Sequence, residues 1–111
     1  MPVADTPALR ITGDADGGTA VLTLAGELDV ATADLLRERI RDLLGRGTDV
    51  RRLVLDLAGL EFLDVTGLGA LLEAHRKLGA VGGTLALRRP RPMVLRMLSL
   101  LKLDDTLQVE H

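Results

Sequence analysis

Apolar residues along this chain repeat with two different spacings, which predict strands and helices in alternation. Alternating or continuous apolar runs predict strands over Leu9–Thr12, Thr19–Ala25, Leu53–Leu57, Thr84–Leu87 and Thr106–Val109. Apolar residues three or four positions apart predict helices over the segment after Asp29, over Thr66–Leu78 and over Met93–Leu101. The order β-β-α-β-α-β-α-β is typical of an α/β fold with a mixed, largely parallel sheet and helices packed on it.

Turn and cap residues support these boundaries. The cluster Gly13–Gly18, GDADGG, predicts a hairpin turn between the first two strands, and it lacks the ligand positions of a calcium loop. Either Asp29 or Thr32 is suited to cap the first helix, and either Gly45 or Gly47 to end it.

The composition of the chain argues against several classes of function. With 111 residues, 47% of them hydrophobic, we expect residues 1–111 to form one domain, with residues 1–8 as a loose N-terminal segment. A net charge of −2 and a single aromatic residue, Phe62, argue against direct nucleic-acid binding. The absence of cysteine excludes disulfides and thiolate chemistry. The N-terminus does not resemble a signal peptide, and no apolar run approaches the roughly 20 residues of a membrane span. The sequence therefore predicts a cytoplasmic protein without membrane insertion.

No pattern in the sequence indicates an enzyme. Ser99 is the only serine, and it falls inside a predicted helix rather than in a G-x-S-x-G turn. His75 lies on or beside the apolar stripe of its helix, which is typical of a partly buried structural histidine. Gly67 and Gly69 lack the third glycine of a dinucleotide fingerprint, and no histidine spacing favours a metal. We predict a binding protein with no cofactor and no metal.

The stretch LDVTG, Leu63–Gly67, leads into a helix whose first turns contain glycines, which are unfavourable there. Gly67 and Gly69 fall in the first turns of a predicted helix, although glycine in a helix interior costs up to about 1 kcal/mol. One explanation is that the helix start stays bare, so that another backbone or a phosphate can approach it, with the Thr66 hydroxyl nearby. Phosphorylation of Thr66 would then add about −1.5 to −2 charges beside Asp64. The other explanation is that Asp64 caps the helix and the glycines allow tight packing on the sheet.

Taken together, these segments resemble a STAS domain, the fold of bacterial anti-sigma factor antagonists. The resemblance runs from about Leu9 to Val109 and rests on LAGELD, on LVLDLAGLEFLDVTGLGAL, and on GGTL followed by a proline-started helix. It implies a sheet with helices packed on one side. It also implies a regulator of transcription that binds an anti-sigma factor and thereby releases a sigma factor to RNA polymerase. In this family the anti-sigma factor is often a kinase that phosphorylates the antagonist in a D-S-[ST]-G stretch, and a phosphatase reverses this.

The resemblance also assigns roles to positions of this chain. Asp64 and Gly67 match the ends of the family stretch, and GELD matches the acidic loop that lies beside it and contacts the partner. The usual phosphoacceptor falls on Val65, whereas the second hydroxyl is kept as Thr66. Either Thr66 has become the phosphoacceptor, or this loop has no phosphoswitch. The expected partner-binding residues are Glu27, Asp29, Asp64, Val65, Thr66, Gly67 and Leu68.

Val65 also favours an alternative function. A STAS module can serve, without phosphorylation, as a scaffold or subunit in a stress-signalling assembly or a lipid-transport system. Domains of this family often carry one more helix after the last strand, and this chain ends soon after Val109.

Overall fold

The strands form one sheet in which the order along the chain and the order in space coincide. The computed structural model describes residues 8–45 and 49–111. Its elements are β1 (Leu9–Asp16), β2 (Thr19–Leu28), α1 (Ala33–Leu44), β3 (Arg52–Leu63), α2 (Val65–Ala80), β4 (Thr84–Arg88), α3 (Pro92–Leu100) and β5 (Gln108–Glu110). The sheet order is β1-β2-β3-β4-β5; β1 is antiparallel to β2, and the other neighbours are parallel. The predicted mixed, largely parallel α/β fold is thus confirmed.

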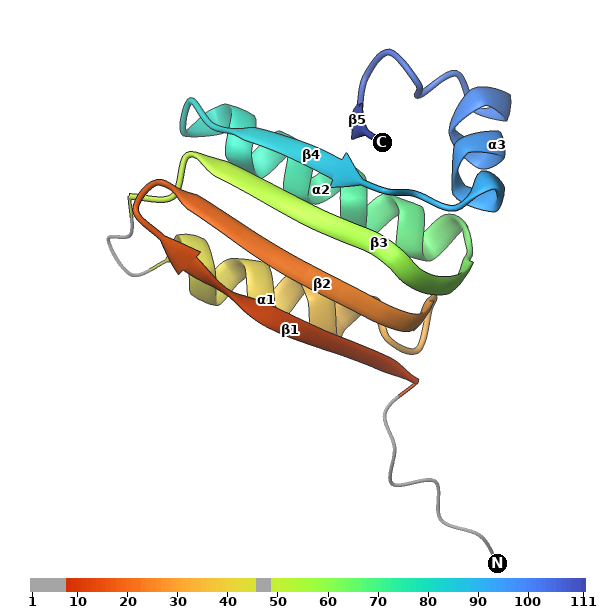
Figure 1. Cartoon of the computed structure of the whole chain (residues 1–111), viewed down its shortest axis with the longest axis horizontal. Coiled ribbons are helices and arrows are strands. Elements are labelled where there is room, and N and C mark those ends of the chain that lie inside the picture. Colours follow the sequence, from red (N-terminus) through yellow and green to blue (C-terminus); the bar gives the residue numbers. More distant parts are fainter. Residues whose placement is uncertain (1–7, 46–48) are drawn as a thin grey trace, which may run out of the picture.

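Two helices cover one face of the sheet. Figure 1 shows α1 and α2 side by side behind β1–β4, whereas α3 lies beyond the end of β4. The connections β2-α1-β3 and β3-α2-β4 step across the sheet in the same direction. Because such crossovers are almost always right-handed, both helices are placed on the same face. An ion pair between Arg37 Nε of α1 and Glu73 Oε2 of α2, at 2.9 Å, joins them.

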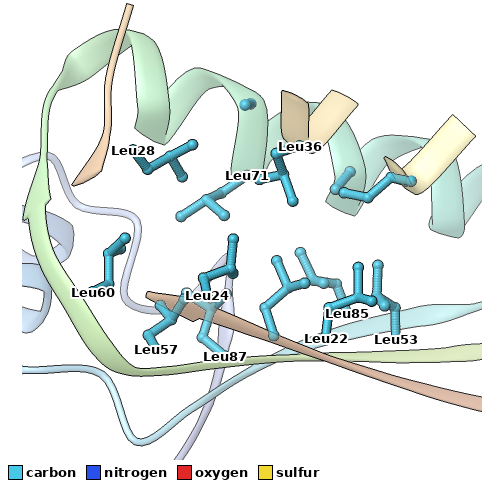
Figure 2. Close-up of a cluster of buried hydrophobic side chains, with 14 of the residues drawn as sticks. Leu22, Leu24, Leu28, Leu36, Leu53, Leu57, Leu60, Leu71, Leu85 and Leu87 are labelled. Carbon is cyan, nitrogen blue, oxygen red and sulfur yellow. The ribbon is translucent and has the colours of Figure 1, made fainter. Parts of the chain in front are cut away.

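The core between these layers is almost entirely aliphatic. Along the first part of β2 and of β3 every second residue points inward, as the period of a strand requires, and these side chains are fully buried: Ala20, Leu22 and Leu24 in β2, and Leu53, Leu55 and Leu57 in β3. Figure 2 shows strand leucines such as Leu24, Leu57 and Leu87 pointing toward Leu36 of α1 and Leu71 of α2. The chain therefore builds its core without aromatic residues, by interdigitating leucines.

The central strand β3 is longer than the apolar pattern predicts. The pattern predicts an end at Leu57, but the strand continues to Leu63 and leads directly into α2. Its pairing with β2 shifts register twice, between Thr23 and Ala25 and between Gly26 and Glu27. Each shift displaces the inward positions, so the alternation that identifies a strand is lost in the sequence. Smaller differences at other ends are that α2 begins at Val65 and β5 covers Gln108–Glu110.

The β1–β2 hairpin lies where the GDADGG segment predicts it, but its turn is shorter. Gly13–Asp16 continue β1 past the predicted end at Thr12 and pair with β2, so the turn consists of Gly17, with a positive φ of 63°, and Gly18. Gly45 is the C-cap of α1. The alternative helix end, Gly47, lies outside the described residues, as do seven of the eight residues expected to form a loose N-terminal segment.

Arginines that follow β4 bind the middle of β3. Arg89 forms an ion pair with Asp56, a buried carboxylate that also accepts a hydrogen bond from the Ala58 N–H at 3.1 Å. Arg91 Nε donates to the Ala58 carbonyl at 2.9 Å. Burial raises the pKa of Asp56, but the hydrogen bonds from Arg89 and Ala58 outweigh it, so that this pKa lies below its ordinary value. These two arginines thus join the segment after β4 to the middle of β3.

Glu110 ties β5 to the sheet and makes the stability depend on pH. It pairs with Arg52 of β3 and, at 3.4 Å, with Arg88 of β4. The hydrogen bond from Arg52, opposed by burial, lowers the pKa of Glu110 below its ordinary value of 4.5. A carboxylate with a lowered native pKa stabilises the fold above its unfolded-state pKa, and this contribution is lost as the pH falls through the native pKa.

We therefore expect Glu110→Gln to be less stable than the wild type at neutral pH. The difference should stay constant down to about pH 4.5, the ordinary value, and then shrink in more acidic solution. Urea unfolding of both proteins between about pH 7 and about pH 3 measures it. A difference that keeps the same size at the acidic end would contradict the assigned ion pairs.

Candidate functional site

The two segments singled out in the sequence meet at one edge of the sheet. Because β2 and β3 are parallel, their carboxyl ends lie together, and Figure 1 shows the β2–α1 loop beside the start of α2. Glu27 pairs with Phe62, and Leu28 pairs with Leu63. We call this surface, made of Glu27–Val30 and Phe62–Leu68, the junction face. Parallel pairing therefore brings the acidic loop and LDVTG together.

Asp64 joins the two halves of the junction face. It is the N-cap of α2, and its Oδ1 accepts a hydrogen bond from the Gly67 N–H at 2.8 Å. Its other carboxylate oxygen accepts from the Val30 N–H, and its own N–H donates to the Leu28 carbonyl, both at 3.3 Å. One side chain thus caps the helix and braces the loop that precedes α1.

The two glycines at the start of α2 have different surroundings. A Cβ added to Gly67 would lie 2.3 Å from the Leu28 carbonyl oxygen, which is closer than Cβ atoms come to atoms of non-neighbouring residues. The backbone that approaches the bare helix start is therefore the chain's own. A Cβ at Gly69 would meet nothing within 4 Å. Gly67 and the Asp64 cap thus fit the explanation that the helix start packs tightly on the sheet. Gly69 does not, because no described residue packs against its Cβ position.

Asp29 shapes the acidic loop from within. Its Oδ1 accepts hydrogen bonds from the N–H groups of Ala31 at 3.0 Å and Thr32 at 3.2 Å. The Thr32 hydroxyl accepts from the Asp29 N–H at 3.0 Å and donates to the Glu27 carbonyl at 2.8 Å. Thr32 is the N-cap residue of α1, but its side chain makes no capping bond to the helix. The carboxylate that organises the start of α1 is thus that of Asp29.

The residues at the phosphoswitch position are open to solvent. Val65 is the first residue of α2 and Thr66 the second, and both are exposed. Within the described residues, the Thr66 hydroxyl takes part in no hydrogen bond, so neither the cap nor the loop depends on it. Gly67 and Leu68, in contrast, are buried. The junction face therefore exposes Val65 and Thr66, whereas the two residues that follow them are buried.

Two residues of this face escaped the sequence analysis, namely Val30 and Phe62. Both are exposed, although both are large and apolar. The available signals were an apolar residue inside the polar loop after Asp29 and the only aromatic residue of the chain near the end of a strand. Neither signal separates a surface residue from a core residue until the register of β3 is known.

The junction face is negatively charged. Glu27 of this face and Glu61, which directly precedes Phe62, are exposed, and in residues 8–45 and 49–111 neither forms an ion pair. The carboxylates of Asp29 and Asp64 accept hydrogen bonds from backbone N–H groups, and no cation of the described chain forms an ion pair with them. The face is thus complementary to a positively charged protein surface.

Other kinds of site find little support in the part of the chain that the structure describes. Within it, no three histidine or acidic side chains gather closely enough to hold a metal ion. His75 is half-buried on α2, as a structural histidine is expected to be. The described helices are also too short or too polar to cross a membrane.

Comparisons with known proteins agree with this architecture. The family model of the STAS domain matches residues 8–111. The anti-sigma F factor antagonist of Paenibacillus polymyxa is 32% identical over 92 residues, which cover 83% of this chain and 78% of that protein. The anti-sigma-B factor antagonist of Bacillus subtilis is 30% identical over 88 residues, covering 79% and 78%. A solved anti-sigma factor antagonist from Mycobacterium paratuberculosis superimposes with a TM-score of 0.79 at 27% identity, over 99% of this chain and 90% of that one. By its matched sequence and its fold, the chain belongs to the STAS domain family.

Proposed function

We propose that this protein is an anti-sigma factor antagonist, which binds an anti-sigma factor through the junction face and so frees a sigma factor for transcription. The observation that carries the proposal is the joining of the acidic loop and the start of α2 into one rigid surface by Asp64. The names of the similar proteins favour this function over a scaffold or transport subunit. Since sigma factors act on RNA polymerase, the protein would work in the cytoplasm.

The residues expected to bind the partner divide into two groups in this proposal. Glu27, Val65 and Thr66 are exposed and would touch the anti-sigma factor directly. Gly67 and Leu68 are buried, so they would act by positioning the exposed residues. Asp29 and Asp64 are half-buried and would combine both roles, since their carboxylates shape the loop and contribute negative charge.

Charge reversal at Glu27 tests the docking function. We expect the wild type to bind a purified kinase-type anti-sigma factor from the same genome, and Glu27→Lys to weaken that binding at least about tenfold, or 1.4 kcal/mol. Glu27 makes no side-chain hydrogen bond in the described structure, so the fold should be unaffected. Isothermal titration calorimetry measures both proteins.

The matched control is Glu38→Lys, an equal charge change on an exposed residue of α1, beside β1 and away from the junction face. It should bind as the wild type does. Equal weakening by both variants would show a general charge effect, and unaltered binding by Glu27→Lys would remove this residue from the interface. No binding by the wild type to any anti-sigma factor of that genome would contradict the function itself.

Thr66 is the residue at which we propose a phosphoswitch. Its hydroxyl is exposed and free of hydrogen bonds in the described chain, and a phosphate there would place about −1.5 to −2 charges beside Asp64. The phosphate would be repelled by the Asp64 carboxylate and would have to lose its hydration where the partner packs, so a partner that fits the unmodified threonine would be displaced. The anti-sigma factor would then be of the kinase type, and a phosphatase would restore binding.

We expect incubation of the wild type with the kinase and ATP to place one phosphate on Thr66, and Thr66→Ala to remain unmodified, as measured by peptide mass spectrometry. Thr66→Ala should change the free energy of unfolding by no more than about 0.5 kcal/mol, because Asp64 and not Thr66 caps the helix. A wild type that binds the kinase but is never phosphorylated would mean that docking operates without a switch at this loop.

A further inference from the structure

Seven large apolar side chains are exposed in the described part of the chain: Val30, Leu35, Phe62, Val65, Val81, Leu100 and Leu101. Three of them belong to the junction face, where Val30 is 75%, Phe62 47% and Val65 73% exposed. We call these three the apolar triad. Single exposed apolar side chains are ordinary, but a gathered group on a soluble protein marks a contact surface.

The triad surrounds one residue, Asp64. Val65 follows it directly, and Phe62 precedes it by two positions on β3. Val30 comes from another segment, and its N–H donates to the Asp64 carboxylate at 3.3 Å. The segments that carry these three exposed residues are therefore brought together by the cap of α2 and by the pairing of β2 with β3.

The triad is also held rigidly before any partner arrives. Phe62 is part of a strand, Val65 begins a helix, and Val30 lies in a loop that Asp64 and Asp29 fix through backbone hydrogen bonds. Valine has few side-chain rotamers, and phenylalanine has only two side-chain torsions. Little conformational entropy is therefore lost when these side chains are buried against a partner, which favours tight binding.

We infer, building on the proposed antagonist function, that the apolar triad is the centre of the docking interface. The partner surface that fits it is an apolar pocket with lysine or arginine side chains at its rim. The rim charges follow from the exposed carboxylates of Glu27 and Glu61 beside the triad, which have no ion-pair partner in the described structure. An apolar centre with a polar rim is the usual layout of protein interfaces, and aromatic residues are often their strongest contacts.

In this layout Val65 contributes directly to partner binding. In place of a hydroxyl, the first residue of α2 contributes an apolar side chain that becomes buried when the partner binds. Phosphate on the adjacent Thr66 would then have to be desolvated at the edge of an apolar pocket, which is unfavourable. The triad thus increases the partner's affinity for the unmodified protein, and it enlarges the loss of affinity that phosphorylation of Thr66 would cause.

The test uses the anti-sigma factor that binds the wild-type chain in calorimetry, with ADP as the nucleotide so that no new hydroxyl is phosphorylated. We expect Val65→Ser and Phe62→Ser each to raise the dissociation constant about tenfold or more. The heat-capacity change of wild-type binding should be clearly negative, because apolar surface is buried. The control is Leu100→Ser, at an equally exposed apolar residue that ends α3 outside the junction face. It should bind as the wild type does, and all three variants should unfold at the wild-type midpoint.

Each other outcome has a distinct meaning. If the wild type and the serine variants bind equally, while Glu27→Lys binds weakly, the interface is polar; the inference is then wrong and the proposed function stands. If the wild type binds no anti-sigma factor, the proposed function fails first and the inference falls with it. If sedimentation shows a wild-type dimer that Val65→Ser converts to a monomer, with partner binding unchanged, the triad is a self-association surface and the inference is overturned.

Discussion

Leu55→Ala is expected to lower the free energy of unfolding by about 2–5 kcal/mol, the largest loss that we predict for this protein. Leu55 lies in the part of β3 that pairs on both sides, between Leu22 of β2 and Leu87 of β4 in register, and its side chain is fully buried. Removing its branched end takes away apolar contacts and leaves a cavity that the neighbouring strands cannot close, because their hydrogen bonds fix the spacing. Urea unfolding monitored by circular dichroism measures the loss.

The control for this change is Leu100→Ala, which removes the same atoms from a side chain that is 76% exposed at the end of α3. Its effect should stay within about 0.5 kcal/mol. Because a domain of this size is stabilised by only about 5–15 kcal/mol, Leu55→Ala should also lower the thermal midpoint by many degrees. A loss as small as that of the control would show that β3 is not the centre of the core.

Gly67→Ala is expected to destabilise the protein by about 1–3 kcal/mol, the cost of overpacking. The new Cβ would lie 2.3 Å from the Leu28 carbonyl oxygen and 2.9 Å from the Leu28 carbonyl carbon, so a strand end has to move. That carbonyl also accepts the Asp64 N–H, so the shift would disturb the brace between the two loops of the junction face. Partner binding should therefore weaken together with stability.

The same substitution two residues later should have the opposite sign. Gly69 lies in the same helix, and a Cβ there meets nothing within 4 Å. Alanine loses less backbone entropy than glycine on folding, so Gly69→Ala should stabilise the protein by about 0.4–1 kcal/mol. Denaturant unfolding of the pair measures both effects. Destabilisation by both variants, or by neither, would contradict the close approach of Leu28 to α2.

The sequence was sufficient for those features whose causes are local. The helices at Ala33–Leu44, Val65–Ala80 and Pro92–Leu100 follow from apolar spacing and cap residues, and all three were predicted to within two residues of their ends where a boundary was assigned. The hairpin followed from the glycines of GDADGG. The family resemblance rested on contiguous motifs, and the matched family model and relatives confirm it.

Other features depended on pairing between distant segments. The extension of β3 to Leu63 was missed because two register shifts hide its alternation. The bonds of Asp64 to Val30 and Leu28 span more than thirty residues of sequence, so no local pattern announces them. Sequence reasoning likewise left open whether Asp29 or Thr32 organises the start of α1, because both residue types serve as caps.

The sequence by itself therefore determined the elements, the fold class and the two segments of the functional surface, since hydrophobic periodicity and cap chemistry act over a few residues. Only the tertiary structure decided how those segments meet: parallel pairing of β2 and β3 sets the acidic loop against LDVTG, and Gly67 admits the Leu28 carbonyl. It also decided that Val30, Phe62 and Val65 are exposed and that the segments carrying them meet at Asp64. The physical reason is that burial and strand register are properties of contacts between distant segments, and an apolar residue has no fixed place until those contacts form.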